Sequence, residues 1–291
     1  MNSKAVFGGV LFLKNGSFCI LGGDQRMLFL ADYLKENKQQ VFLSGFDRLK
    51  IGTATKEALL EAVQFSDMII LPIPLTKDGV ALNLPYSSFE IPLQELKELI
   101  KRKRCFGGGE LLGCEGYTDL LKEEWLTIHN AELTAQGAIA RALTNSQNSL
   151  SDSTVLVAGF GRIGKQLARI LQPMCRNLYV SARKAKDRAE IESMGYRFVP
   201  TQQICEKKKQ FDIIFSTIPA KIFNQETLVC AKPKALLIDL ASAEGSIEKS
   251  AAQLLDLQLI HALSVPGKDF PKTAGKLLGQ TILQLYQGES V

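Results

Sequence analysis

The feature that most constrains the fold is a glycine-rich turn in the middle of the chain. Four apolar residues at 155–158 precede it, and an amphipathic stretch at 166–171 follows. The turn itself reads Gly159, Phe160, Gly161, Arg162, Ile163, Gly164. Glycines in this order between a strand and a helix allow a tight turn, close approach of a pyrophosphate, and close packing of the helix on the sheet. The pattern predicts a dinucleotide bound at the helix N-terminus.

The end of the next predicted strand, at 178–181, indicates which dinucleotide is bound. NAD sites usually carry Asp or Glu here, which bonds the ribose 2′-hydroxyl. Ser181, Arg183 and Lys184 occupy this place instead. Arg183 would form charge-assisted hydrogen bonds with a 2′-phosphate, and Ser181 could donate another. The sequence therefore predicts NADP rather than NAD, unless Arg183 and Lys184 are ordinary solvated charges.

Length and composition fit a two-domain globular protein. The 291 residues are 46% hydrophobic, and the net charge of +5 is scattered along the chain. This modest excess argues against nucleic acid and suits an anionic substrate. Six cysteines without C-x-x-C spacing and only two histidines predict free thiols and no metal site. The apolar run at 5–13 is too short for a membrane span and lacks a signal-peptide cleavage site, so we expect a cytoplasmic protein.

A second strand–turn–helix opening precedes this unit. The apolar strand 18–21 leads through two glycines into a helix, and the strand 41–43 follows, without a complete dinucleotide fingerprint. Asp24 and Arg26 would lie at the carboxyl end of the first strand, where open α/β sheets bind ligands. We expect Arg26 to bind an anion, and Asp24 to be either a site residue or a helix N-cap.

The remaining elements of the first half are less clearly marked. We expect a helix at 56–63, a strand at 68–71, and a helix at 93–103 that ends in a basic, solvated cap at 101–104. Three glycines at 107–109 indicate either close backbone packing or a hinge. A short strand at 125–128 and a helix at 134–145 follow, and the polar segment 145–149 indicates a domain boundary.

The second half repeats a strand–helix rhythm. Its predicted strands are 154–158, 178–181, 197–199, 211–215, 235–239 and 257–260, with the apolar content of a parallel sheet buried on both faces. Residues that follow two of these strands are candidates for the nicotinamide ribose, although each could be only a loop residue. They are Thr217, Pro219, Ala241 and Ser242.

The last segment is expected to begin as a rigid loop at 265–275 and to continue as a helix at 276–286. Lys272 and Thr273 would lie near the helix N-terminus, a favourable place for a carboxylate. We expect this helix to pack back on the first domain and close the cleft. The predicted class is α/β, with two Rossmann-like domains and doubly wound parallel sheets. The domains are a substrate or catalytic domain (1–145), an NADP-binding domain (146–270) and the returning helix (271–291).

Several segments resemble the dipicolinate synthase family, and specifically the A-type of that enzyme's two subunits. They are 22–26, 45–47 and 134–139 in the first domain, and 159–164, 181–183, 217–219, 239–242, 266–267 and 271–275 afterwards. The resemblance covers about residues 17 to 288, and the turn at 22–26 and the segment 271–275 are its most specific parts. Two positions depart from the family pattern: Gln136 stands where Glu is usual, and Ser216 where Asn is usual.

The resemblance implies NADP-dependent oxidation of dihydrodipicolinate to dipicolinate, in the mother cell of a spore-forming bacterium. It also implies a flavoprotein-like partner, the B-type subunit of dipicolinate synthase. A cyclic dicarboxylate needs cations, for which we expect Arg26, Lys268 and Lys272, with Asp24 and Thr273 beside them. Because the product is aromatic, positioning and exclusion of water would do most of the catalysis. A homo-oligomer is left open.

Two other functions are left open by the sequence. A 2-hydroxyacid dehydrogenase would share the two-domain arrangement, but His261 has no obvious Glu partner, and we interpret both His129 and His261 as structural. A non-catalytic NADP-binding subunit that completes a partner's site would tolerate departures such as Gln136. Measuring turnover by the isolated chain and with the B-type subunit would separate this second alternative from an enzyme. Turnover by the isolated chain would indicate an enzyme, and turnover only with the B-type subunit would favour the non-catalytic subunit.

Overall fold

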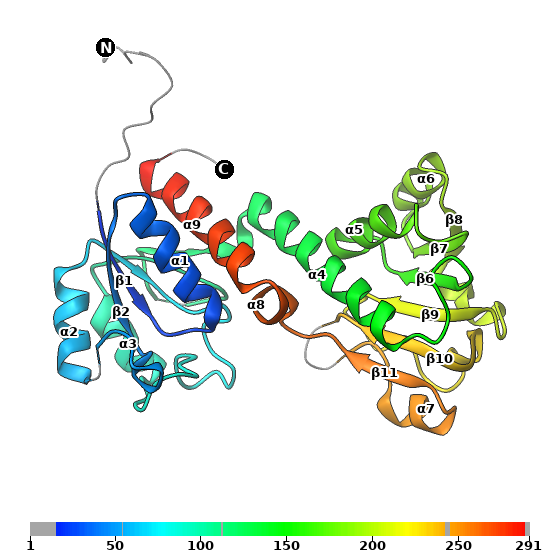
Figure 1. The fold of residues 1–291 in the computed structure, drawn as a ribbon, viewed down its shortest axis with the longest axis horizontal. Coiled ribbons are helices and arrows are strands. Elements are labelled where there is room, and N and C mark those ends of the chain that lie inside the picture. Colours follow the sequence, from blue (N-terminus) through cyan, green and yellow to red (C-terminus); the bar gives the residue numbers. More distant parts are fainter. Residues whose placement is uncertain (1–15, 54, 112, 242–244, 289–291) are drawn as a thin grey trace, which may run out of the picture. The chain divides into compact units, whose positions relative to one another are not determined.

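The computed structural model describes residues 16–53, 55–111, 113–241 and 245–288. They form two compact units: one runs to Leu126 and resumes at Pro271, and the other is Thr127–Phe270. Each is a helix-covered parallel sheet (Figure 1), which confirms the predicted fold class. The division falls inside α4 (Glu124–Asn145), ahead of the polar segment at 145–149, because the apolar face of that helix packs into the core of the second unit.

The first unit has a sheet in the order β2-β1-β3-β4-β5, with every pairing parallel. Its strands are β1 (Ser17–Leu21), β2 (Gln40–Ser44), β3 (Met68–Ile70), β4 (Arg104–Gly107) and β5 (Tyr117–Asp119). Its helices are α1 (Gln25–Glu36), α2 (Lys56–Phe65), α3 (Leu93–Ile100) and α9 (Pro271–Gln287), with 3₁₀ turns η1 (Asp47–Leu49) and η2 (Leu120–Lys122).

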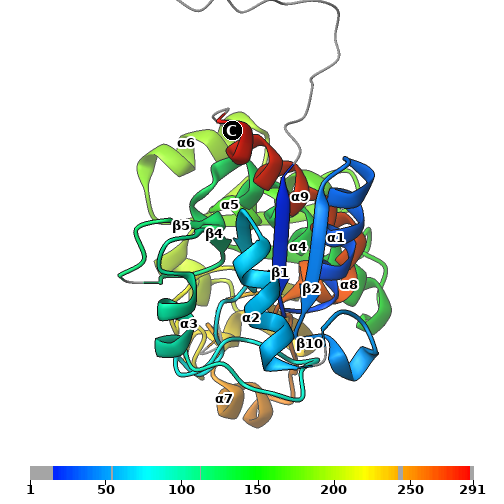
Figure 2. The same cartoon turned by 90° about the vertical axis from the view of Figure 1, so that its left-hand side faces the viewer.

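Alternate residues of β1 explain why its apolar run is continuous. Phe18 and Ile20 pack with α1 and α9, whereas Cys19 and Leu21 pack with α2 and α3 on the other face. Figure 2 shows α1 and α9 side by side. The two helices approach closely through glycine: a Cβ on Gly275 would lie 2.5 Å from the Arg26 carbonyl oxygen. The C-terminal helix therefore returns to the first unit, as predicted.

The second unit has a sheet in the order β11-β10-β9-β6-β7-β8. Its strands, all parallel, are β6 (Thr154–Ala158), β7 (Asn177–Ala182), β8 (Arg197–Pro200), β9 (Phe211–Ser216), β10 (Ala231–Asp239) and β11 (Gln258–His261). Its other helices are α5 (Arg162–Leu171), α6 (Ala185–Ser193), α7 (Lys249–Leu254) and α8 (Val265–Asp269), with 3₁₀ turns η3 (Thr201–Glu206) and η4 (Leu228–Cys230). Helices α4, α5 and α6 share one core, and α7 packs in the other.

Three predicted elements of the chain differ in the structure. Residues 125–128 belong to helix α4 rather than a strand, because a four-residue apolar run is compatible with either and Leu126 is buried on the helix. Helix α3 ends at Ile100 instead of 103, since the chain turns there into β4, a strand too short and glycine-rich to recognise. The predicted loop at 265–275 is instead helix α8, over 265–269, followed by the start of α9, which begins at Pro271 rather than at 276.

The basic cluster at 101–104 does not simply cap its own helix. Lys103 Nζ donates to the carbonyl oxygens of Gln64 and Ser66, at 2.9 and 2.7 Å, at the end of α2. Arg104 Nη2 donates to the carbonyl oxygen of Leu285, at 2.7 Å, in the last turn of α9. Both cations thus lie at helix C-termini, but at those of other helices in the same unit.

The sequence left open whether the glycines at 107–109 allow close backbone packing or form a hinge. Gly107 ends β4, and a Cβ there would lie 2.9 Å from the Tyr117 hydroxyl oxygen. A Cβ on Gly108 would lie 2.6 Å from the side chain of Ile73. Close packing, rather than a hinge, accounts for these two glycines.

The cysteines of the described residues are free thiols, and three of them are buried. Burial raises the pKa of Cys19, Cys105 and Cys230 to about 12. Because the thiolate is the reactive form, we expect alkylation of each at pH 8 to be about 1,000-fold slower than in the unfolded chain. Peptide mapping by mass spectrometry after timed iodoacetamide treatment, with guanidinium-unfolded protein as the control, measures the ratio. Equal rates in both samples would contradict the burial of these thiols.

Candidate functional site

The glycine turn has the geometry that its spacing predicts. Gly159 follows β6 with a φ of 102°, in the region that favours glycine. A Cβ on Gly164 would lie 2.1 Å from the carbonyl oxygen of Gly159, so α5 approaches the turn as closely as a glycine allows. Gly161 is different, since a Cβ there would meet no described atom within 4 Å.

This open space lies at the beginning of α5. Gly161 is the N-cap of the helix, and no described side chain caps it. The first N–H groups of a helix bind anions because they lack intrahelical acceptors and lie at the positive end of the helix dipole. A backbone without a Cβ at Gly161 and a helix N-terminus beside it therefore fit a pyrophosphate. This is the feature of the unit that best matches a dinucleotide.

Strand order places this turn at the switch point of the sheet. β6 lies between β7 and β9, as in other doubly wound sheets, and ligands of such sheets bind where the strand order reverses. Thr217, which follows β9, reaches the same point: its Oγ1 donates to the carbonyl oxygen of Ala158 at 3.0 Å. The structure thus brings Thr217 beside Gly159. Pro219 is exposed two residues further on, Ala241 is buried after β10, and Ser242 lies outside the described residues.

Ser181 faces the glycine turn and is fully buried. Its Oγ accepts from the Gly159 N–H at 3.3 Å, and the Thr201 hydroxyl donates to it at 3.5 Å. These contacts favour a role in holding the turn over direct contact with a 2′-phosphate.

We expect Ser181→Ala to weaken NADPH and NADH binding by the same factor, because it loosens the turn that both cofactors share. The loss of these hydrogen bonds should also cost about 1 kcal/mol of unfolding free energy. Titrations of both cofactors and a urea unfolding curve test this, with Ser153→Ala as the control. Ser153 lies just before the amino end of β6, away from the glycine turn. It is equally buried, and its hydroxyl donates to the carbonyl oxygen of Ser149. A loss confined to NADPH would instead make Ser181 a phosphate ligand.

Arg183 and Lys184 present free positive charge beyond the end of β7. Both are exposed, and within the described ranges neither side chain makes a hydrogen bond or an ion pair. Arg188, one turn into α6, is by contrast paired with Glu192 at 2.9 Å. Unpaired cations at this place have the charge and position that a ribose 2′-phosphate requires.

Asp24 and Arg26 are joined in the first unit. Asp24 is the N-cap of α1, and its side chain accepts a hydrogen bond from the Arg26 backbone N–H. Of the two roles that the sequence allowed for Asp24, a site residue or an N-cap, the structure shows the N-cap. The Arg26 side chain is 9% exposed, and its Nε and Nη2 donate to the Asp24 carboxylate at 2.9 Å. Nη2 also donates to the carbonyl oxygen of Ile73. Two of the three guanidinium nitrogens are therefore already bonded.

This pair lies at the switch point of the first sheet. The order β2-β1-β3 reverses between β1 and β3, and Arg26 connects the loop after β1 to the loop after β3. Gly23 N–H donates to the carbonyl oxygen of Asn83 at 3.1 Å, which adds a second connection to the loop that follows β3. Arg26 thus holds the loops after β1 and β3 together at the carboxyl ends of these strands.

The remaining candidates lie near the C-terminus. Lys268 is exposed on α8, in the second unit, and Lys272 and Thr273 are exposed in the first turn of α9, in the first unit. Asp269 forms an ion pair with Arg141 of α4, which fixes α8 within its unit. No sequence pattern signals that pair, because its members are separated by most of the second unit.

Asp239, a buried acid on the same edge of the sheet as the glycine turn, was not among the site residues predicted from the sequence. Asp239, at the end of β10, is fully buried and accepts from the backbone N–H groups of Ala241, Ser246 and Ile247 and from the Ser246 hydroxyl. His261 Nδ1 lies 3.9 Å from Asp239 Oδ2. The sequence signal that could have found it is an acid that ends an otherwise apolar strand.

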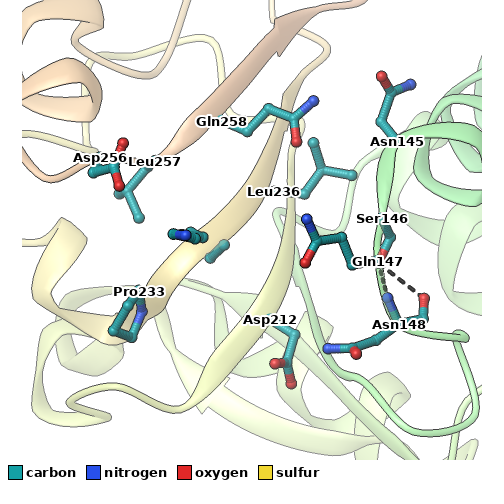
Figure 3. Close-up of a pocket in the computed structure, with 12 residues that line it drawn as sticks. Asn145, Ser146, Gln147, Asn148, Asp212, Pro233, Leu236, Asp256, Leu257 and Gln258 are labelled. Carbon is teal, nitrogen blue, oxygen red and sulfur yellow. Dashed lines mark hydrogen bonds between the residues drawn. The ribbon is translucent and has the colours of Figure 1, made fainter.

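A polar cavity of about 510 Å³ lies at the other end of the second sheet. Figure 3 shows Asn145, Gln147 and Asp212 around it, with Leu236 and Gln258 from β10 and the start of β11. It adjoins the amino ends of the strands, whereas the glycine turn lies at their carboxyl ends. It is therefore not the dinucleotide site.

Neither a metal centre nor a membrane span is found among the described residues. They contain no cluster of three or more His, Cys, Asp or Glu side chains that could hold a metal ion. No helix within the described ranges has both the length and the apolar character for crossing a bilayer.

Family models match both halves of the chain. Residues 17–111 match the N-terminal domain of the dipicolinate synthase A-type subunits. Residues 125–265 match the NAD-binding domain of the D-isomer specific 2-hydroxyacid dehydrogenases. The second match supports an oxidoreductase that uses a nicotinamide dinucleotide.

Relatives extend over nearly the whole chain. The dipicolinate synthase A-type subunit of Bacillus subtilis (strain 168) is 30% identical over an alignment 279 residues long, which covers 91% of this chain and 94% of the relative. The solved structure of that type of subunit from Bacillus subtilis has a TM-score of 0.81 at 28% identity, covering 95% of this chain and 97% of that one. The structure of its counterpart from Bacillus halodurans has a TM-score of 0.79 at 26% identity, covering 94% and 98%. The chain belongs to the family of dipicolinate synthase A-type subunits.

Proposed function

We propose that this protein oxidises dihydrodipicolinate to dipicolinate with NADP, as the A-type subunit of a dipicolinate synthase that works with a flavoprotein-like B-type subunit. Membership of the family supports the substrate. The observation that carries the cofactor assignment is the open turn at Gly161. Beyond the next strand lie Arg183 and Lys184, which are exposed and pair with none of the described residues. We also propose a role in sporulation, in the cytoplasm of the mother cell.

The reaction removes a hydride and a proton from a cyclic dicarboxylate, and the hydride passes to the nicotinamide when NADP is bound. Because the product is aromatic, the main task of the protein is to hold the two reactants and exclude water. The two carboxylates of the substrate require cations. Lys272 and Lys268 are exposed and make no ion pair among the described residues, so they are better candidates for direct contact than the buried Arg26.

Lys272→Ala should raise the KM for the dicarboxylate about tenfold without changing stability, because a charge-assisted contact is lost from an exposed position. The matched control is Lys35→Ala, an exposed lysine in the last turn of α1. Steady-state kinetics with saturating NADP measures both variants. An unchanged KM in Lys272→Ala would remove this residue from the substrate site.

The decisive experiment follows NADP reduction with freshly generated dihydrodipicolinate. NAD is run in parallel, and each reaction is run with and without the B-type subunit. NADPH and dipicolinate formed together would support the reaction, and dependence on the B-type subunit would locate part of the site on the partner. Tight NADPH binding without turnover in any mixture would point to the non-catalytic alternative.

A second candidate is a dehydrogenase that acts on a 2-hydroxyacid. The match of residues 125–265 to that class of NAD-binding domain favours it. Reduction of 2-oxoacids by NADPH, tested with the same protein, separates it from oxidation of the cyclic dicarboxylate.

A further inference from the structure

Three buried side chains form a connected polar group at the carboxyl ends of β9 and β10: Ser216, Asp239 and Ser246, here called the Asp239–Ser246 network. All three are fully buried. The Ser246 hydroxyl is hydrogen-bonded to the Ser216 hydroxyl at 2.6 Å and to Asp239 Oδ1 at 3.0 Å. A buried polar group is costly unless it is bonded, so a fully bonded group of this kind fixes local geometry.

The network bonds the described ends of the loop that follows β10, at Ala241 and at Ser246 and Ile247. Asp239 Oδ2 accepts from the Ser246 N–H at 2.7 Å and from the Ile247 N–H at 3.1 Å. Asp239 Oδ1 accepts from the Ala241 N–H at 3.0 Å. The carboxylate therefore binds backbone at both ends of this loop. Gly245 packs against it, since a Cβ there would lie 2.8 Å from Asp239 Oδ2.

The same network holds the loop that follows β9. The Ser246 carbonyl oxygen accepts from the N–H groups of Ile222 and Phe223, each at 3.1 Å. At its other end this loop is fixed by Thr217, which donates to the Ala158 carbonyl oxygen. Residues 219–221 between these anchors are exposed. Both loops thus depend on Ser246.

We propose that Asp239 and Ser246 are positioning residues for the nicotinamide half of the cofactor. This inference rests on the proposed function. In doubly wound sheets each half of the sheet binds one nucleotide, so the glycine turn and Arg183 serve the adenosine half. β9 and β10 belong to the other half, and their loops carry Thr217, Pro219 and Ala241. By fixing these two loops, the network sets the positions at which Thr217, Pro219 and Ala241 would contact the nicotinamide nucleotide.

The test compares two ligands, NADPH and adenosine 2′,5′-bisphosphate, which contains only the adenosine half. We expect Ser246→Ala to weaken NADPH binding about tenfold and to leave the affinity for the bisphosphate within about twofold, because the lost hydrogen bonds hold only the second half of the site. NADPH fluorescence should also report a more solvated nicotinamide in the variant. Isothermal titration measures both affinities, and the melting temperature checks that the variant is folded.

Two further variants make the result specific. Ser216→Ala removes a single hydroxyl and should shift the same ratio in the same direction, which keeps the test available if Ser246→Ala does not fold. Ser153→Ala removes an equally buried hydroxyl at the amino end of β6 and should leave the ratio unchanged.

The outcomes separate this inference from the proposed function. If the unmodified protein binds neither ligand, the NADP assignment fails, and the same comparison is made with NADH and 5′-AMP. If it binds both and Ser246→Ala weakens both equally, or neither, the positioning role is overturned while the cofactor assignment stands.

Discussion

Gly164→Ala is expected to lower the free energy of unfolding by about 2 kcal/mol and to abolish measurable dinucleotide binding. The new Cβ would lie 2.1 Å from the carbonyl oxygen and 2.9 Å from the carbonyl carbon of Gly159. Backbone atoms cannot rotate away as a side chain does, so α5 must move off the sheet. Overpacking of this kind costs about 1–3 kcal/mol, which exceeds the gain in helix propensity of up to about 1 kcal/mol from replacing glycine. Urea unfolding and NADPH titration measure the two effects.

Gly161→Ala is the matched control, because it should also weaken cofactor binding but leave stability nearly unchanged. A Cβ at Gly161 meets no described atom within 4 Å, and its φ of −81° suits any residue. Stability should fall by no more than about 0.5 kcal/mol, the cost of a poorer N-cap. Cofactor binding should still weaken at least tenfold, because the methyl group would enter the space for the pyrophosphate. Equal stability losses in the two variants would refute this account of the turn.

Arg183→Asp is expected to weaken NADPH binding about 100-fold while NADH binding is retained or improved. The substitution removes a charge-assisted contact with the 2′-phosphate, worth about 1.5–3 kcal/mol, and places a carboxylate where NAD sites carry one. Arg183 is exposed and unpaired among the described residues, so the melting temperature should not change. Fluorescence titration of both cofactors measures the reversal of preference.

The control for this variant reverses a charge elsewhere on the same unit. Lys208 is exposed shortly before the amino end of β9, at the edge of the sheet away from the glycine turn. Lys208→Asp makes the same kind of change in charge as Arg183→Asp but should leave both affinities unaltered. If Arg183→Asp behaved like Lys208→Asp, Arg183 would be an ordinary surface charge and the preference for NADP would lose its support.

Local patterns predicted the parts of the fold that depend on neighbours in the sequence. The strand, turn and helix around Gly159–Gly164 were recognised because each glycine has its task within a few residues. The six strands of the second unit were recognised because burial on both faces leaves continuous apolar runs. The short strands β4 and β5 and the start of α4 were missed, since runs of three or four residues carry too little periodicity to distinguish a strand from a helix or a loop.

Residue types also predicted some local contacts correctly and others only in part. Asp24 is an N-cap, which was one of the two roles considered for it. Lys101 does stand at the end of its own helix α3, whereas Lys103 and Arg104 meet the C-terminal ends of α2 and α9. The chemistry of a lysine at a helix end was foreseeable, whereas the identity of the helix depended on how the elements pack.

The sequence by itself determined the α/β class, the glycine turn and the absence of an acid after β7, because these depend on residue type and short spacing. The tertiary structure alone decided what Arg26, Ser181 and Asp239 do. Arg26 bonds a carbonyl oxygen 47 positions away, Ser181 bonds an N–H 22 positions away, and Ser216 meets Ser246 across 30 positions. These buried side chains hold loops in place, because a buried polar group without a hydrogen bond is costly. The partner of each is a group that packing brings close, however distant it is in the sequence.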